Sequence, residues 1–376
     1  MAPKIKSQRV VLFVANYSFT LINFRKNLIK ALQKDYVVYA ICSDDAYSDA
    51  LQKMGVKLLL VNFNGRHKNP FAELACFLKI LWHVILIRPV AVLSFTIKAN
   101  LYCGLARYVS KFHFFPNVTG LGSFTSQQGI LSFLYNSLYR IFLNKCTAVF
   151  VQNVDNFNYI KNLTICNDNQ IILLPGSGVD LKKFKFYPYK FSHLPRKFYF
   201  ISRIMKEKGV IEFLQAAQMF YEGGGLAEFY LVGNVLSEFS AEFEQKLKGT
   251  RATYLGESND IRSQIENCDV LVLPSYYNEG TPKILIEAAA MGRAIITSDM
   301  PGCRDLISNN NGYKVRIKDP HDLLEKFSLF ASLTDMKVQE MGKNSRILAE
   351  TNFSEELVIK SYLNAFNSAI NTLNCN

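Results

Sequence analysis

Two glutamates eight positions apart are the side chains in this sequence best suited to chemistry. Glu279 follows the apolar, β-branched run 270–274 and the polar stretch 275–278, and Glu287 lies among the apolar residues 284–290. The apolar run predicts a buried parallel strand, and the residues after it predict a loop and then a helix. This order puts both carboxylates at the carboxyl edge of a parallel sheet, where anionic and sugar-phosphate ligands bind and where carboxylates can accept hydrogen bonds from hydroxyl groups.

The helix that carries Glu287 has recognisable start and stop signals. Thr281 suits the N-cap, Pro282 the first helical position, and Gly292 the residue after the helix end. The alternative is that both glutamates are solvated surface residues, as most glutamates are. Because the helix is apolar nearly all round, Glu287 is expected to be buried and to need a partner.

Two cations precede this motif in a similar setting. Residues 197–201 predict a strand and 210–220 a helix, so Arg203 and Lys208 lie on the loop between them. An arginine fork and a lysine point charge suit the negative charges of a nucleotide diphosphate. The alternative is a pair of solvated surface cations.

Together these segments resemble the donor site of retaining GT-B glycosyltransferases of family four, and the resemblance spans most of the second half of the chain. The segments that carry the resemblance are Glu279-Gly280-x-Pro282-x-x-x-x-Glu287, 292–296, 299–305, Ser202 to Gly209, Leu231-Val232-Gly233 and Gly176 to Asp180. The implied fold is α/β, with two Rossmann-like domains facing across a cleft.

The resemblance also implies a role for each motif residue. Glu279 is expected to bind the donor sugar's hydroxyls, Glu287 the ribose, and Arg203 with Lys208 the diphosphate, so that Glu279, Arg203 and Lys208 form the catalytic set. The donor is expected to be a UDP-sugar carrying GalNAc or GlcNAc, transferred with retention and without a cofactor. The remaining donor-binding residues are expected to be Gly280, Thr281, Pro282, Ile284, Leu285 and Gly233.

The strand and helix pattern predicts two α/β units and a closing helix. The boundaries expected are 1–188 for an acceptor-binding domain, 189–355 for the donor domain, and 356–376 for a helix that packs back toward the first domain. The first domain opens with a strand at 9–14, a loop at 16–20, a helix at 21–32 and a strand at 36–40. Residues 181–196 are the expected linker.

The acceptor is expected on the first domain, at two loop starts. Residues 94–100 and 117–124 each follow a predicted strand, and they resemble segments of bacterial family-four enzymes that extend undecaprenyl-diphosphate-linked sugars for O-antigen, capsule or glycoprotein glycans. Relatives often have a histidine where Thr119 stands, so the departing phosphate oxygen is the expected base for the incoming hydroxyl. Lys98 is expected to meet an acceptor diphosphate. The expected acceptor-binding residues are Asn16, Thr96, Lys98, Thr119 and Gly120.

Charge is unevenly divided along the chain. Residues 1–190 contain 23 lysines and arginines against 8 aspartates and glutamates, a net of +15, and the remainder carries −3. No arginine-rich tract or nucleic-acid-binding motif accompanies this charge, so an anionic membrane surface is the expected partner and nucleic acid is not.

Residues 70–89 predict a helix that could lie in that membrane surface. Glu73, Lys79 and His83 interrupt it, so a transmembrane span is not expected; a core helix is the alternative. Its apolar side chains follow a helical period at Phe71, Leu74, Ala75, Leu78, Leu81, Trp82 and Ile85.

Other features narrow the function. The eight cysteines form no metal-ligand or C-x-x-C pattern, which favours reduced thiols. The apolar run after the basic residues at the N-terminus covers only Val10 to Ala15, which suits a first strand rather than a signal peptide, so a cytoplasmic protein on the inner membrane face is expected. No Asp-x-Asp occurs, so no bound metal is expected. A GT-B-fold UDP-sugar epimerase and a non-catalytic membrane-surface nucleotide-binding protein remain as alternatives.

Overall fold

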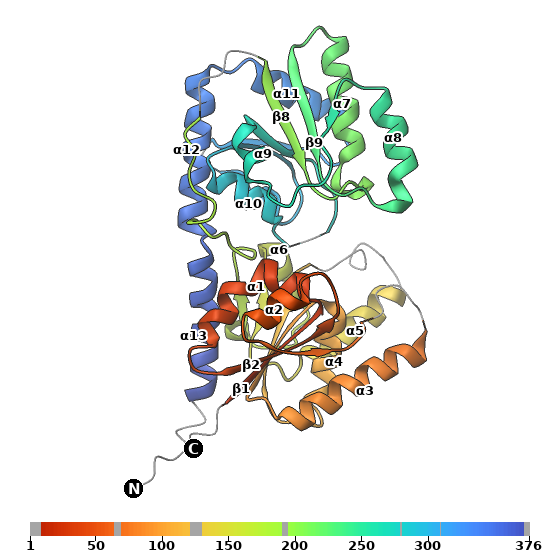
Figure 1. Ribbon diagram of the computed structural model, residues 1–376, viewed down its shortest axis with the longest axis vertical. Helices are drawn as coiled ribbons and strands as arrows, with labels where there is room; N and C mark the ends of the chain where they lie inside the picture. The colour runs from red at the N-terminus through yellow and green to blue at the C-terminus, as the bar shows by residue number, and fades with distance from the viewer. Residues whose placement is uncertain are drawn as a thin grey trace. The chain divides into compact units, whose positions relative to one another are not determined.

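A computed structural model describes residues 9–63, 69–120, 130–189, 195–278, 280–308 and 310–371 of the 376-residue chain. The chain divides into two compact units (Figure 1). Unit 1 comprises Met1–Ser177 together with Val358–Asn376, and unit 2 comprises Gly178–Leu357.

Unit 1 is built on a seven-stranded sheet in the order β3-β2-β1-β4-β5-β6-β7, and its paired strands are parallel. Its strands are β1 Val10–Tyr17, β2 Val37–Ser43, β3 Lys57–Leu60, β4 Ala91–Phe95, β5 His113–Val118, β6 Val149–Val151 and β7 Ile171–Leu173. Its helices are α1 Ser18–Leu32, α2 Ser48–Lys53, α3 Pro70–Ile87, α4 Ile97–Ala106, α5 Ile130–Leu143, α6 Val154–Asn162 and most of α13 Glu355–Asn371, and a 3-10 turn, η2, covers Asp168–Gln170.

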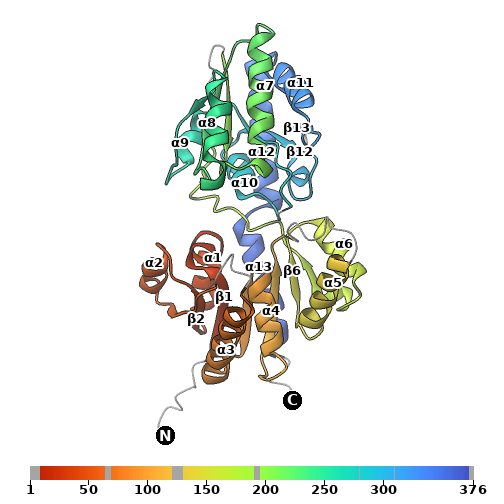
Figure 2. The ribbon, with the colours of Figure 1, turned by 90° about the vertical axis from the view of Figure 1, so that its right-hand side faces the viewer.

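The sheet of unit 1 is covered on both faces, which explains why its central strands are apolar throughout. Along β1, Val11 and Phe13 pack toward the core that α1, α2 and α13 share. The alternate residues Leu12 and Val14 pack toward the core of α3, α4 and α6. Helices α3 and α4 run side by side on that second face (Figure 2).

Unit 2 repeats the plan with six strands in the order β10-β9-β8-β11-β12-β13. Phenylalanines of α7 and α11 pack in tilted or edge-on contact with the strand residues Phe198 and Phe229, which stack on each other. Its strands are β8 Arg196–Ile201, β9 Ala227–Val232, β10 Thr253–Tyr254, β11 Val270–Leu273, β12 Ala294–Ser298 and β13 Gly312–Val315. Its helices are α7 Val210–Glu222, α8 Ser240–Lys248, α9 Arg262–Asn267, α10 Lys283–Ala290, α11 Pro320–Ala331 and α12 Asp335–Asn352, and its 3-10 turns are η3 Lys206–Lys208, η4 Ser237–Phe239 and η5 Arg304–Leu306.

Each sheet has one topological switch point, where the strand order reverses direction. In unit 1 it lies between β1 and β4, and in unit 2 between β8 and β11. Doubly wound sheets bind ligands at the carboxyl ends of the strands at this point. The fold therefore offers one natural ligand edge in each unit.

Two boundaries expected from the sequence differ in the structure. Residues 178–189 belong to unit 2 and are not a linker, because Phe184 is buried in its core and the Tyr187 N–H donates to the Met291 carbonyl at 3.3 Å. The division therefore falls after Ser177 and not after residue 188. No loop separates β1 from α1, since the strand continues to Tyr17 and the helix begins at Ser18.

Candidate active site

At the carboxyl edge of the unit 2 sheet, the loops after four strands touch through their backbones. Gly233 has a φ of +145°, and a Cβ there would lie 1.7 Å from the Ser202 carbonyl oxygen. Gly302 has a φ of +78°, and a Cβ there would lie 1.7 Å from the Gly280 carbonyl oxygen. Only glycine fits at either position, so the loops after β8, β9, β11 and β12 form one closely packed layer.

Hydrogen bonds join the loop after β11 to the turn η3. The Tyr276 N–H donates to the Glu207 carbonyl at 2.9 Å, and the Ser275 hydroxyl donates to the same oxygen at 3.3 Å. The Thr297 hydroxyl donates to the Leu273 carbonyl at 2.7 Å, which ties the end of β11 to β12. The segment that leads to Glu279 is thus held against the turn that carries Lys208.

The two expected diphosphate ligands lie in this layer but differ in exposure. Lys208 is 5 % exposed, and its Nζ lies 5.4 Å from the centroid of the Tyr277 ring. Arg203 lies two residues after β8 and is exposed. Two cations on one loop beside a switch point suit a ligand with several negative charges.

Glu287 is buried, as its apolar surroundings predict. Its side chain lies in α10, and burial raises its pKa to about 7, while Lys283 and Lys183 favour the carboxylate. The Lys283 Nζ is 3.9 Å from one Glu287 oxygen. Near neutral pH this carboxyl group can therefore gain or lose a proton, and as a carboxylate it can accept hydrogen bonds from hydroxyl groups.

The remaining expected donor residues lie around the start of α10. Gly280, Thr281, Pro282 and Leu285 are buried, and Ile284 is half-buried. Thr281 was wrongly expected as the N-cap: Pro282 occupies that position with a ψ of 119°, which is extended and not helical, and the helix begins at Lys283. Glu279 lies outside the described residues.

Sequence reasoning missed three side chains near this site. Lys283 precedes Glu287 by four residues, the spacing at which helix side chains meet, so the sequence could have indicated that Lys283 lies near Glu287. Tyr277 lies in the motif loop itself. Lys183 gave no signal, because only the packing of residues 178–189 on unit 2 brings its charge near Glu287.

In unit 1, two of the expected acceptor residues meet at the switch point. The Thr96 hydroxyl, directly after β4, donates to Asn16 Oδ1 near the end of β1 at 2.7 Å. Thr96 has a φ of +111°, an unfavourable value for a residue with a branched side chain. Backbone strain of this kind persists only where surrounding contacts enforce it, and it clusters at functional sites.

A buried polar network supports the same edge. The Ser94 hydroxyl donates to Asn100 Oδ1 at 2.7 Å, and the Asn100 amide donates to the Asn117 carbonyl at 2.9 Å. The Asn117 side-chain amide donates a hydrogen bond to the Ser94 carbonyl at 3.1 Å, and the Tyr362 hydroxyl of α13 donates to Asn117 Oδ1. The starts of both acceptor loops are thereby fixed to one another and to α13.

The other expected acceptor residues are at the same edge. Lys98 lies in the first turn of α4, and its Nζ is 2.5 Å from a Glu73 oxygen. Thr119 and Gly120 are half-buried and follow β5 directly. The expected turn at 120–122 continues into residues 121–129, outside the described part of the chain.

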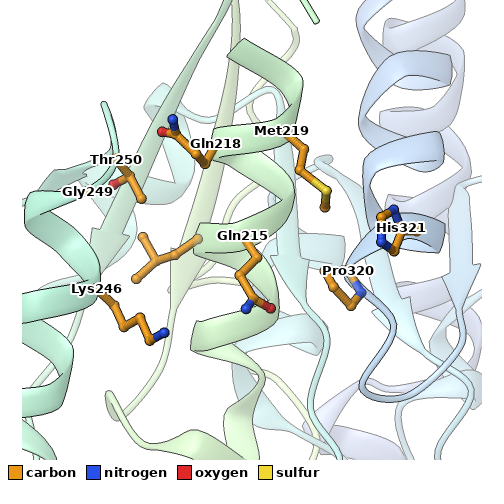
Figure 3. A pocket seen from close by; sticks show the side chains of 9 residues that line it. Gln215, Gln218, Met219, Lys246, Gly249, Thr250, Pro320 and His321 are labelled. Carbon is orange, nitrogen blue, oxygen red and sulfur yellow. The ribbon is translucent and has the colours of Figure 1, made fainter. Parts of the chain in front are cut away.

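We searched the described residues for a metal site and for a pocket that could offer the donor a different binding place (Figure 3). Among the residues that the structure describes, no group of three His, Cys, Asp or Glu side chains could hold a metal. A depression of about 360 Å³ lies between α7, the end of α8 and the start of α11, lined by Gln215, Gln218, Lys246, Thr250 and His321 among others. None of the residues expected to bind the donor lines it.

Comparison with known proteins identifies a family match in the second half of the chain and relatives that align over part or nearly all of it. The family described as Glycosyl transferases group 1 matches residues 182–347. An N,N'-diacetylbacillosaminyl-diphospho-undecaprenol alpha-1,3-N-acetylgalactosaminyltransferase of Campylobacter jejuni is 32% identical over 95% of this chain and 98% of its own length. A UDP-Gal:alpha-D-GlcNAc-diphosphoundecaprenol alpha-1,3-galactosyltransferase of Escherichia coli is 29% identical over 55% of this chain and 56% of its own length.

Solved structures share the two-unit fold. A glycosyltransferase from Rickettsia africae aligns with a TM-score of 0.77 and 18% identity over 97% of this chain and 99% of that chain. Anabaena HepE in complex with UDP aligns with a TM-score of 0.75 and 15% identity over 95% of this chain and 99% of that chain. The expected α/β fold with two Rossmann-like units is confirmed.

Proposed function

The chain belongs to the group 1 glycosyl transferases, the retaining family four, and from this membership we propose that it transfers an N-acetylhexosamine from UDP to a saccharide linked to undecaprenyl diphosphate. We favour GalNAc over GlcNAc as the donor sugar, because the relative that is similar from end to end is an N-acetylgalactosaminyltransferase. The product belongs to a bacterial surface polysaccharide or a protein-linked glycan.

The observation that carries this proposal is that the similarity to the Campylobacter enzyme includes unit 1. The family match covers residues 182–347, which lie in unit 2, whereas the alignment with the Campylobacter enzyme extends over 95% of the chain. Because unit 1 holds the expected acceptor residues, similarity there supports a lipid-diphosphate-linked acceptor rather than a nucleotide-binding role alone.

The proposed mechanism assigns each donor residue a task. Lys208 and Arg203 neutralise the UDP diphosphate as the glycosidic bond breaks, Glu287 accepts hydrogen bonds from the ribose, and Glu279 accepts them from the sugar. A lysine buried beside an aromatic ring is preorganised for this task, because little water must be displaced from it during the reaction. With Thr119 at the position of the family's histidine, the leaving phosphate oxygen takes the proton of the incoming hydroxyl.

An anionic membrane surface is the proposed partner of α3. One stripe of this helix is buried against unit 1 at Cys76, Ile80 and Val84. Its outer face exposes Phe71 (80 %), Trp82 (65 %) and Leu86 (68 %), with Leu74, Leu78 and Ile85 also exposed. Exposed Lys79 and Arg88 border this face, and unit 1 carries 20 lysines and arginines against 7 aspartates and glutamates.

The packing of α3 favours an interfacial position. By length and composition this helix could cross a membrane. Crossing would pull its buried stripe away from unit 1, whereas lying in the interface buries only the exposed apolar face and leaves the stripe in place. We therefore propose a peripheral location at the inner face of the cell membrane.

The test is a transfer assay with a panel of donors and acceptors. Purified protein is incubated with UDP-GalNAc, UDP-GlcNAc or UDP-Gal and with vesicles that contain N,N'-diacetylbacillosaminyl-diphospho-undecaprenol or GlcNAc-diphosphoundecaprenol, and the lipid products are analysed by mass spectrometry. We expect a lipid heavier by one N-acetylhexosamine. Interconversion of UDP-sugars without acceptor would instead identify an epimerase, and UDP binding without turnover would contradict an enzymatic role.

A further inference from the structure

Glu73 is the acidic residue of α3, and its carboxylate contacts α4. It lies in the first helical turn, three residues before Cys76 and seven before Ile80, so it continues the buried stripe of this helix. One oxygen contacts Lys98 Nζ at 2.5 Å, and the other accepts a hydrogen bond from the Tyr102 hydroxyl. Both Glu73 and Lys98 side chains are 30% exposed, so the pair remains in contact with solvent.

The three side chains clamp two helices together. Lys98 and Tyr102 are four residues apart on α4, so they lie on one face of that helix and together hold both Glu73 oxygens. Tyr102 is 5 % exposed, and it also packs against Phe77 of α3, with ring centroids 6.0 Å apart. Partial burial raises the pKa of Glu73, but the hydrogen bonds from Lys98 and Tyr102 and the charge of Lys98 lower it by more. The pKa of Glu73 therefore lies below its ordinary value, which favours the carboxylate.

The clamp joins the proposed membrane helix to the proposed acceptor edge. Helix α4 begins directly after the strained Thr96, and Lys98 lies in its first turn. The exposed apolar face of α3 begins at Phe71, two residues before Glu73. The side chain that holds Lys98 therefore comes from the helix that would lie in the lipid interface.

On the basis of the proposed function, we propose that Glu73 is a positioning residue that fixes the height of Lys98 above the membrane. The diphosphate of a lipid-linked acceptor is anchored at the level of the lipid head groups. A lysine locked to an interfacial helix meets such a diphosphate at a fixed depth, whereas a lysine on a helix that can shift relative to α3 does not. Glu73 acts through Lys98 and does not itself bind the acceptor.

The experiment compares one saccharide diphosphate on two lipids. The membrane acceptor is N,N'-diacetylbacillosaminyl-diphospho-undecaprenol in anionic vesicles, and the soluble acceptor is the same saccharide diphosphate on a short, water-soluble prenyl chain. We expect Glu73→Ala to raise the KM for the vesicle-bound acceptor about tenfold, a loss of about 1.4 kcal/mol, and to change the KM for the soluble acceptor less than about twofold. Lys98→Ala should raise the KM for both acceptors, because it removes the lysine that is expected to bind the acceptor diphosphate. Glu73→Gln should retain most of the wild-type preference, because its amide oxygen can still accept from Lys98 and its amide NH2 can donate to the Tyr102 hydroxyl oxygen.

One control variant separates a positioning role from loss of structure. Asp168→Ala removes another exposed ion pair of unit 1, between Lys161 of α6 and Asp168 of η2 at 2.5 Å, and it should leave the ratio of the two KM values unchanged. Equal effects of Glu73→Ala on both acceptors, or no effect on either, would overturn the inference while transfer itself continues. Absence of transfer by the wild-type protein would instead contradict the proposed function.

Discussion

At the scale of single residues, the structure separates two lysines that the sequence presents as neighbours in one turn. Lys208 is buried beside Tyr277, whereas Lys206 is exposed and pairs with Glu242 at 2.6 Å. Their different surroundings give a matched pair for testing the diphosphate site.

We predict that Lys208→Ala slows sugar transfer by about two to three orders of magnitude, about 3–4 kcal/mol, because it removes a preorganised charge next to the leaving group. Lys206→Ala should remain within a few-fold of wild type, since an exposed ion pair contributes little. Steady-state kinetics with radiolabelled UDP-GalNAc measure both, and circular dichroism checks that each variant is folded. Wild-type turnover in Lys208→Ala would remove this residue from the site.

Glu287 should make stability depend on pH in a direction opposite to that of most carboxylates. Burial raises its folded-state pKa to about 7, above the unfolded value. The stability that it contributes is therefore fully present below the unfolded pKa and is lost as the pH rises through about 7. Relative to Glu287→Gln, the wild-type free energy of unfolding should fall between about pH 5 and about pH 8 in urea titrations. Parallel pH profiles of the two proteins would show that Glu287 does not titrate in this range.

The UDP affinity of the same pair tests the proposed role of Glu287. If the ionised carboxylate accepts the ribose hydroxyls, wild-type affinity should rise with pH through about 7, and Glu287→Gln should bind weakly with no such rise. Calorimetric titration with UDP measures both.

At the scale of elements, the sequence predicted the helix α3 but not its side-chain contacts with α4. The sequence predicted a helix over residues 70–89 from its apolar spacing, and the structure has it at Pro70–Ile87, with Asn69 as its cap and Pro70 at its start. Glu73, however, looked in the sequence like a mere interruption of an apolar helix. Its partners Lys98 and Tyr102 lie on another helix, and only tertiary packing brings them together.

The exposed face of α3 should bind anionic vesicles. Wild-type protein should float with such vesicles at low salt and be released at high salt, because each basic residue near the surface contributes about 1 kcal/mol and a few apolar side chains add to it. Leu78→Glu combined with Trp82→Glu should not float but should still bind UDP. Leu226→Glu, a control at a 79 % exposed leucine of unit 2, should float like wild type. Flotation of the double variant would move the membrane contact to another surface.

At the scale of the whole molecule, the two sheets follow directly from the sequence, whereas the links between distant segments do not. Parallel strands that are buried on both faces appear as continuous apolar runs, which is why β8 and β11 were found close to their observed limits. The donor motifs were readable because each occupies one strand, loop and helix. The network at Asn117 was not, since its Tyr362 partner is 245 positions away in the chain.

Transfer should not depend on a divalent metal. The proposed site has Arg203 and Lys208 where the UDP diphosphate would lie, and these cations can neutralise the leaving group without a metal ion. We predict that activity in the assay with UDP-GalNAc and lipid acceptor persists in excess EDTA. Loss of activity that Mn²⁺ restores would contradict this prediction.

The position of α13 in the chain affects the order in which the protein is completed during synthesis. In unit 1, Tyr362 packs on Phe150 and Phe366 on Phe115, with ring centroids 4.2 and 5.6 Å apart. The ribosome adds these residues only after all of unit 2, whose residues 178–357 are continuous and can fold as they emerge. Until then Phe115 and Phe150 lack their last covering helix, and Asn117 lacks its Tyr362 hydrogen bond. The unit that is synthesised first is therefore the unit that completes its core last.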